Sequence, residues 1–155
     1  MTAARLVEVA RARAATLATA ESCTGGLVAA AITETPGASD VFDRGFVTYS
    51  NAAKIEMLGV QSATLDAHGA VSEAVAREMA AGALGRSNAD IAVSITGIAG
   101  PGGSEHKPEG RVCFGRAQSG VAARAETVEF GALGRDGVRQ ASLTHAVGLL
   151  IQALS

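Results

Sequence analysis

The stretch ATAESCTGGLVAA, residues 18–30, joins a short apolar run to a second apolar segment through a cluster of small polar side chains. The run at its start, Ala15–Ala20, is too brief for a helix and is typical of a buried strand. After the cluster, apolar residues recur at helical spacing, which predicts a helix over Thr24–Glu34. This stretch therefore predicts a strand that turns directly into a helix.

The same alternation continues through the rest of the chain. Further strands are predicted over residues 44–50, 89–96, 111–118 and 124–130. Further helices are predicted before residue 15, over residues 51–58 with Asn51 as the N-cap, from a Ser72 cap to Leu84, and over residues 138–154. Strands and helices alternate first, and two strands then follow each other directly. This order predicts an α/β protein with a mixed, mostly parallel sheet and helices on both faces.

Length, composition and charge limit the classes of protein that fit this chain. Its 155 residues predict one domain, residues 1–155. Hydrophobic residues make up 48% and aromatic residues only 3%, which predicts a core of aliphatic side chains and alanine. The formal net charge of −2 lacks the basic excess of proteins that hold a phosphate backbone, so we expect no nucleic acid partner.

Cysteine usage and hydropathy predict a cytoplasmic location. Cys23 and Cys113 form no C-x-x-C motif, which favours neither a zinc site nor a disulfide and fits a reducing compartment. No run approaches the roughly 18 apolar residues of a membrane span, and residues 1–15 lack the apolar centre of a targeting segment. We therefore expect no membrane partner, no metal and no cofactor.

Ser22 lies at the predicted turn between the first strand and its helix. Free N–H groups in the first turn of that helix would point toward whatever Ser22 faces, and such groups bind a phosphate or a developing oxyanion. The candidate binding residues are Cys23, Thr24, Gly25 and Gly26. Cys23 is also a rival nucleophile, although the neighbour of Ser22 should point elsewhere. The alternative is structural, with Ser22 or Thr24 capping the helix while the glycines pack against a strand.

Tyr49 and Lys54 stand out in the stretch VTYSNAAKIEMLGV, residues 47–60. Tyr49 is the only tyrosine, and Lys54 and Lys107 are the only lysines among 13 cationic residues. In a chain that otherwise uses arginine, a lysine can be present because it is able to lose its proton. The alternative is a solvated helix lysine in a chain of biased composition.

A glycine-rich loop opens at the end of the predicted strand 89–96, in SITGIAGPGGSEHKPEG, residues 94–110. It matches neither the P-loop nor the dinucleotide-binding motif, so ATP and NAD are not indicated. Its backbone could cradle a phosphate, helped by a threonine hydroxyl, and loops of this length are often functional. The candidate binding residues are Thr96, Gly97, Gly100 and Gly102. A plain turn-rich loop is the alternative.

Four collinear stretches resemble one known family. They are TAESCTGGL (19–27), TYSNAAKIEMLGV (48–60), GAVSEAVA (69–76), and ADIAVSITGIAGPGG (89–103) with KPEG downstream. Together they resemble the CinA C-terminal domain family, the nicotinamide mononucleotide deamidases. The resemblance implies a three-layer α/β/α sandwich that hydrolyses the carboxamide of nicotinamide mononucleotide to nicotinate mononucleotide and ammonia, without a metal, in pyridine nucleotide recycling. It also implies a homo-oligomer.

Carried over by position, the resemblance implies that Ser22 is the nucleophile and Lys54 the general base. Tyr49 would orient the lysine or relay its proton. A substrate-binding arginine is also implied, but GALGRDGVRQAS (131–142) departs from the family pattern and offers either Arg135 or Arg139. Many family members carry an N-terminal domain that is not expected here, and we expect no pyrophosphatase activity of the kind associated with that domain.

Two other hypotheses remain open at this point. The same loops could belong to a nucleotide-binding module without catalytic activity, in which Ser22 only donates a hydrogen bond. They could also belong to a Ser/Lys amidase that acts on a different small amide. Ammonia release from nicotinamide mononucleotide distinguishes the first of these from the deamidase, and competition among related amides distinguishes the second.

Overall fold

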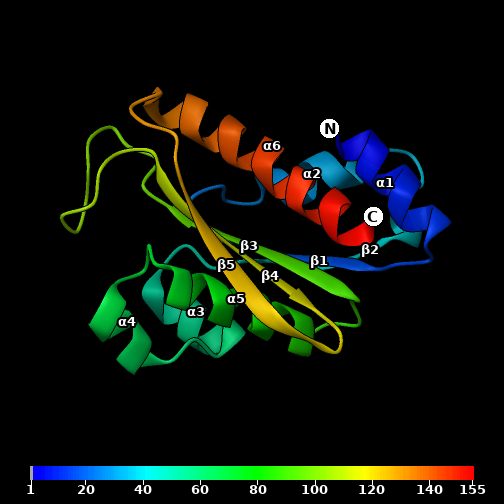
Figure 1. Cartoon of the computed structure of the whole chain (residues 1–155), viewed down its shortest axis with the longest axis horizontal. Helices are drawn as coiled ribbons and strands as arrows, with labels where there is room; N and C mark the ends of the chain where they lie inside the picture. Colours follow the sequence, from blue (N-terminus) through cyan, green and yellow to red (C-terminus); the bar gives the residue numbers. More distant parts are fainter. Residues whose placement is uncertain (1) are drawn as a thin grey trace.

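The computed structural model describes residues 2–155, and within them five strands and six α-helices follow one another (Figure 1). The strands are β1 (Leu17–Glu21), β2 (Phe42–Val47), β3 (Ile91–Gly97), β4 (Arg111–Gln118) and β5 (Val121–Glu129). The helices are α1 (Ala3–Ala12), α2 (Leu27–Thr33), α3 (Asn51–Leu58), α4 (Ser62–His68), α5 (Glu73–Gly85) and α6 (Gly134–Leu154). A short 3-10 helix, Ala38–Asp40, precedes β2.

The five strands form a mixed sheet in the order β2-β1-β3-β4-β5. β1 lies between β2 and β3 and runs parallel to both, while β4 runs antiparallel to β3 and to β5. Four strands therefore point in one direction and β4 opposes them. The predicted α/β class with a mixed, mostly parallel sheet is confirmed.

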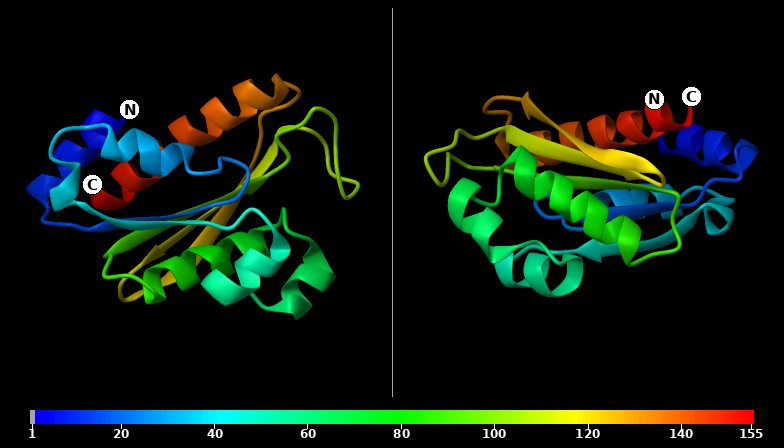
Figure 2. Two further views of the ribbon diagram at one scale, coloured as in Figure 1. Left: turned by 180° about the vertical axis from the view of Figure 1, so that it is seen from behind. Right: turned by 60° about the horizontal axis from the view of Figure 1, so that its bottom comes forward.

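Helices cover both faces of this sheet. In Figures 1 and 2, α1, α2 and α6 lie on one face, and α3, α4 and α5 lie on the other. The longest helix, α6, packs against β3 and α1, and α5 packs against β3 and β4. The result is the three-layer α/β/α arrangement that the resemblance implied.

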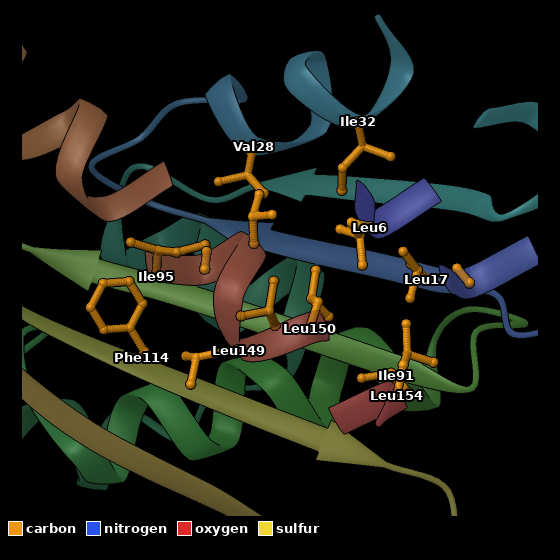
Figure 3. Close-up of a cluster of buried hydrophobic side chains, with 14 of the residues drawn as sticks. Leu6, Leu17, Val28, Ile32, Ile91, Ile95, Phe114, Leu149, Leu150 and Leu154 are labelled. Carbon is orange, nitrogen blue, oxygen red and sulfur yellow. The ribbon is translucent and has the colours of Figure 1, made fainter. Parts of the chain in front are cut away.

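The larger hydrophobic core lies between the sheet and the layer of α1, α2 and α6 (Figure 3). It draws buried side chains from five elements: Leu6, Leu17, Ile32, Ile95 and Leu150. Burying an aliphatic side chain of this size contributes about 1.5–3 kcal/mol. On the other face, a second core is built around Val75 and Met79 of α5 and several alanines, whose small side chains let the helix approach the sheet closely.

α2 begins later than the sequence predicts. The expected start at Thr24 is wrong, because Gly25 and Gly26 have positive φ angles of 58° and 104°. Two successive residues in this left-handed region cannot belong to a right-handed helix. α2 therefore begins at Leu27, after a glycine turn.

Other helix boundaries also differ from prediction. The Ser50 hydroxyl accepts a hydrogen bond from the Ala53 N–H (3.0 Å), so Ser50 and not Asn51 is the N-cap of α3. The sequence pattern does not predict α4, because only one of its seven residues, Leu65, is buried. α6 starts at Gly134, four positions before the predicted Val138, because its first turn is solvated and shows no apolar periodicity.

The carboxyl ends of β2, β1 and β3 meet at one edge of the sheet, where α/β folds bind ligands. The glycine-rich loop, residues 98–110, leaves β3 at this edge and extends away from the helical layers in Figures 1 and 2. Ser22 and this loop both follow strand ends at this edge, so the predicted site residues lie close together. Across residues 2–155, we find no helix with the length and apolar character needed to cross a membrane.

Candidate active site

A cleft of about 360 Å³ lies at the carboxyl ends of the three parallel strands. The turn after β1, the start of α3, the glycine-rich loop and the first turn of α6 form its walls. The predicted site residues that line it are Ser22, Cys23, Tyr49, Lys54, Thr96, Gly97, Gly100, Gly102 and Arg135. The other predicted residues, Thr24, Gly25, Gly26 and Arg139, are not part of the described lining.

Ser22 and Lys54 meet in this cleft although they are 32 positions apart in the chain. Lys54 Nζ lies 3.0 Å from Ser22 Oγ. Both side chains are removed from water, with 1% of Lys54 and 8% of Ser22 exposed. A hydroxyl in hydrogen-bond contact with an amine is the geometry that an activated serine nucleophile requires.

Two different elements fix this pair. The Ser22 N–H donates to the Ile95 carbonyl of β3 (2.9 Å), so the backbone of Ser22 continues the line of β1. Lys54 lies in the first turn of α3, and its N–H donates to the carbonyl of the capping residue Ser50 (3.1 Å). The contact between Ser22 and Lys54 therefore rests on a strand end and a helix start, both rigid positions.

Lys54 Nζ has two further partners, the main-chain carbonyls of Thr48 (3.0 Å) and Tyr49 (3.3 Å). A neutral amine has two N–H bonds and one lone pair. The two carbonyls can accept both N–H bonds, which leaves the lone pair directed at the Ser22 hydroxyl. The arrangement therefore suits a neutral lysine that accepts the proton of the serine.

Burial lowers the pKa of Lys54 below the ordinary value for lysine, because the ammonium form is poorly solvated in this position. Negative charge on Cys23 or Glu105 acts in the opposite direction but more weakly. A lowered pKa increases the fraction of neutral amine near neutral pH. Lys54 is therefore suited to act as a general base.

Cys23, the rival nucleophile, has a pKa that is shifted away from reactivity. Burial raises the pKa of its thiol to about 11. The thiolate is the nucleophilic form of cysteine, so a thiol with this pKa is unreactive near neutral pH. The hydroxyl of Ser22, and not the Cys23 thiol, contacts the base.

The first turn of α2 is not the free anion site that the sequence analysis predicts. Glu21, buried at the end of β1, accepts hydrogen bonds from the N–H groups of Val28 (2.9 Å) and Ala29 (3.0 Å). The Gly25 N–H donates to the Ser22 carbonyl and closes the turn. These three donors are therefore unavailable to a ligand.

The Cys23 N–H is different, because within residues 2–155 it donates to no main-chain carbonyl and its only partner is the thiol of its own side chain. Cys23 lines the cleft and directly follows Ser22. Its main-chain N–H is therefore the donor best suited to an oxyanion beside the serine.

Glu21 is a structural residue of the site that sequence reasoning missed. Its carboxylate holds α2 in place and its main-chain carbonyl accepts a hydrogen bond from the Thr48 N–H (2.9 Å), so it ties the serine turn to the segment after β2. The feature of the sequence that could have identified it is a carboxylate at the end of an otherwise apolar strand.

Tyr49 takes part in the cleft through two separate groups. Its main-chain carbonyl contacts Lys54 Nζ, while its side chain is 61% exposed. The phenol oxygen accepts a hydrogen bond from Arg135 (2.9 Å). In this arrangement the carbonyl orients the lysine, and the phenol is engaged elsewhere and does not relay a proton to it.

The glycine-rich loop is tied to the start of α6 by two side chains. Arg135 donates to the Gly100 carbonyl (2.7 Å). Glu109 accepts hydrogen bonds from the N–H groups of Gly102 (2.7 Å) and Gly134 (3.0 Å), one at each carboxylate oxygen. Sequence reasoning quoted Glu109 within KPEG but did not select it, since its two partners lie seven and 25 positions away.

Thr96 lies in the cleft wall, but its hydroxyl proton is already engaged. The hydroxyl donates to the Ala70 carbonyl (2.9 Å). It can therefore accept a hydrogen bond from a ligand, whereas donation to a phosphate oxygen requires breaking this contact. The expected role as a phosphate donor does not follow from this geometry.

The two candidate arginines have different positions. Arg135 lines the cleft. Arg139, one turn further along α6, donates to the carbonyls of Cys23 and Thr24 (3.2 Å each) and so supports the serine turn from outside the cleft. Of the two, Arg135 is the one that can face a ligand.

The cleft also lacks the donor set of a metal site. Within the described part of the chain, no three side chains of histidine, cysteine, aspartate or glutamate gather closely enough to hold a metal ion. The lining includes the Ser22 hydroxyl, the Lys54 amine and the Arg135 guanidinium, and Glu105 contributes a single carboxylate.

A three-layer α/β/α protein with a buried serine–lysine pair at its strand ends is the class that the fold and the site define. The sequence model of the CinA C-terminal domain matches residues 1–154, and the chain belongs to this family.

Individual relatives agree with this assignment. The chain is 54% identical over 146 residues to the nicotinamide-nucleotide amidohydrolase PncC of Escherichia coli K12, a match that covers 92% of this chain and 86% of the relative. It is 60% identical over 113 residues to a CinA-like protein of Chloroherpeton thalassium, covering 72% of this chain and 27% of the relative. The chain spans between 27% and 34% of the length of this and two other curated relatives.

A solved structure supports the same relationship. The crystal structure of the competence/damage inducible protein CihA from Agrobacterium tumefaciens matches with a TM-score of 0.93 at 47% sequence identity. The match covers 98% of this chain and 92% of that one. The fold is therefore shared over nearly the whole length of both proteins.

Proposed function

We propose that this chain is a nicotinamide-nucleotide amidase, which hydrolyses the carboxamide of nicotinamide mononucleotide to nicotinate mononucleotide and ammonia. Membership of the family and the activity in the name of the 54% identical relative from Escherichia coli support this choice of substrate. The observation that carries the proposal is the 3.0 Å contact between Ser22 Oγ and the Nζ of a buried lysine, Lys54, whose pKa is lowered. This pair is suited to acyl transfer from an amide.

In the first half of the reaction, Ser22 Oγ attacks the carboxamide carbon and its proton passes to Lys54 Nζ. The carbonyl oxygen becomes an oxyanion, which the Cys23 N–H stabilises; a donor of this kind lowers the barrier by about 3–4 kcal/mol. Lys54 then returns the proton to the amide nitrogen, the C–N bond breaks, and ammonia leaves. The nicotinoyl group is now an ester of Ser22.

In the second half, water takes the place of ammonia. Lys54 accepts a proton from the water, whose oxygen attacks the ester carbon. When the C–O bond to the serine breaks, Lys54 returns that proton to Ser22 Oγ. The products are nicotinate mononucleotide and the regenerated Ser22–Lys54 pair, so Lys54 acts as base and acid in turn.

The other end of the cleft would hold the nucleotide part of the substrate. Arg135 is the cation there, and charge-assisted hydrogen bonds to phosphate are among the strongest polar contacts a protein can make. The glycines of the loop allow the backbone to approach a ligand closely. We propose that Arg135 and this loop bind the 5′-phosphate, that residues 1–155 act as one catalytic domain, and that the enzyme works in cytoplasmic pyridine nucleotide recycling.

Ammonia release from nicotinamide mononucleotide tests the proposed function directly. We expect turnover by the purified chain, complete loss in Ser22→Ala with substrate affinity within about tenfold of wild type, and activity in the matched neighbour variant Cys23→Ala. Binding of nicotinamide mononucleotide without ammonia release would instead identify a nucleotide-binding module. Preferred turnover of another small amide would reassign the substrate, and an inactive Cys23→Ala with an active Ser22→Ala would reassign the nucleophile.

A further inference from the structure

β5 is a nine-residue strand at the edge of the sheet. All nine residues are exposed or half-buried, and Figure 1 shows the strand along the border of the sheet, between the layers of α5 and α6. The outer side of such a strand presents main-chain groups that no other strand pairs within residues 2–155. It is therefore a ready site for pairing with another strand.

The ladder with β4 shows which groups of β5 point outward. The Phe130 N–H donates to the Gly110 carbonyl (2.8 Å), directly beyond the end of the ladder. Hydrogen-bonded and non-hydrogen-bonded pairs alternate in an antiparallel ladder, so the even-numbered residues of β5 direct their main-chain groups toward β4. The register of this ladder shifts between Arg116 and Gln118, so the alternation applies from Arg124 onward, where Ala125 and Thr127 direct their main-chain groups to solvent.

Side chains on the two faces of β5 are assigned by their contacts. Glu126 Oε2 lies 3.2 Å from His145 Nε2 of α6, and the Thr127 hydroxyl donates to Glu73 of α5 (2.7 Å). Side chains alternate along a strand. Arg124 therefore shares the α6 face with Glu126.

Two arginines lie next to each other on this face. Arg124 lies directly opposite Arg116 of β4, and like charges in this position are destabilising. Within residues 2–155, neither arginine forms a salt bridge. Both line a hollow of about 200 Å³ together with Glu126 and Gln152. The edge therefore offers unpaired main-chain groups and two arginines that, within residues 2–155, form no salt bridge.

We propose that β5 pairs with β5 of a second copy of this chain, antiparallel and centred on Ala125. Ala125 would then form a hydrogen-bonded pair with the partner's Ala125, through the main-chain groups that point outward. Arg124 would lie opposite the partner's Glu126, and Glu126 opposite the partner's Arg124, in the closely spaced non-hydrogen-bonded positions. Each copy thus places a carboxylate directly opposite the other copy's Arg124, and the two sheets become continuous.

The charges of Arg124 and Glu126 favour this register over the neighbouring registers. A shift of the centre by two residues would place Arg124 opposite the partner's Ala122 or Phe130, with no carboxylate across from it. A centre at Arg124 or at Glu126 would place like charges opposite each other. The centre at Ala125 places Arg124 and Glu126 each opposite a residue of opposite charge. No residue of β5 lines the catalytic cleft, so this pairing leaves the cleft free.

Sedimentation of charge-reversal variants tests this interface. We expect the wild-type chain to sediment as a dimer, and Arg124→Glu and Glu126→Arg each to weaken self-association by about tenfold or more, since each places like charges opposite each other twice. The variant with both substitutions should dimerise again. An equimolar mixture of the two single variants should form a mixed dimer, since both cross-strand pairs are then of opposite charge.

The control is Arg5→Glu, an exposed charge reversal on α1 that should leave the mass of the assembly unchanged. Thermal unfolding of each variant verifies that it is folded, and the doubly substituted variant and the mixture keep the test valid if one single variant is unstable. A wild-type monomer at all concentrations would overturn the proposal. So would a dimer that both single reversals leave intact, or a mixture that forms no mixed dimer.

Discussion

The two ends of the cleft are built in different ways. At one end, Ser22 and Lys54 are buried and held by a strand end and a helix start, and burial lowers the pKa of the lysine. At the other end, Arg135 is exposed and is held by hydrogen bonds to a loop carbonyl and a phenol. Desolvation can neutralise a lysine, while an arginine keeps its charge. With the proposed function, we therefore expect proton transfer at the buried end and binding of an anion at the exposed end.

The two lysines of the chain give the largest expected contrast. Lys54→Met keeps an unbranched apolar stem of similar length but removes the amine, so kcat should fall by about a hundredfold or more, as for loss of a general base. Lys107→Met removes an amine that donates to the His68 and Val71 carbonyls and so holds the glycine-rich loop. We expect it to raise KM more than it lowers kcat. Steady-state ammonia release measures both, and equal losses of kcat would remove the distinction between the two ends.

The two arginines of α6 give the next contrast. Arg135→Ala should raise KM for nicotinamide mononucleotide by about tenfold, the worth of one charge-assisted contact, and should leave the KM for nicotinamide riboside unchanged. Arg139→Ala, which frees the carbonyls of Cys23 and Thr24, should instead lower kcat for both substrates. Kinetics with the paired substrates check this. Equal effects of Arg135→Ala on the nucleotide and the riboside would show that Arg135 does not bind the phosphate.

Glu109 gives the smallest expected effect. Glu109→Gln replaces one of two carboxylate oxygens by an amide nitrogen, so one of the contacts to Gly102 and Gly134 is lost and the loop end loosens. KM should rise a few-fold, about 1 kcal/mol for one hydrogen bond, with kcat little changed. The matched control is Glu78→Gln, a carboxylate with two comparable contacts outside the cleft. A similar rise of KM in this control would indicate a general loss of stability and no specific role for Glu109.

Much of the fold could be predicted from the sequence because its signals are local. The apolar strand 15–20 and the apolar spacing after Leu27 fix the first strand and helix, and the direct succession of β4 and β5 fixes the mixed character of the sheet. Ser22 and Lys54 could also be selected, since one follows a strand end and the other is a rare lysine. Their 3.0 Å contact depends on the packing of β1 beside β2, which spacing alone does not give.

The remaining features depend on contacts that no local pattern encodes. Glu21 and Glu109 act through main-chain N–H groups of other segments, and the engagement of the Thr96 hydroxyl depends on the Ala70 carbonyl 26 positions away. The free first turn expected for α2 was wrong for the same reason, since Glu21 supplies its acceptor from the preceding strand. Distant partners of this kind become visible only in the folded chain.

The most direct test of the central claim is the pH dependence of kcat for Lys54→Arg beside that of the wild type. If Lys54 is the base, the wild-type rate should rise with pH as the amine loses its proton, along a limb whose apparent pKa lies below the ordinary value for lysine, because burial disfavours the ammonium form. Arginine stays protonated at any working pH, so the variant should lose about a hundredfold or more in kcat and lack the limb. A Lys54→Arg enzyme with nearly normal kcat and an unchanged limb would contradict the account and reduce Lys54 to a positive charge in the cleft.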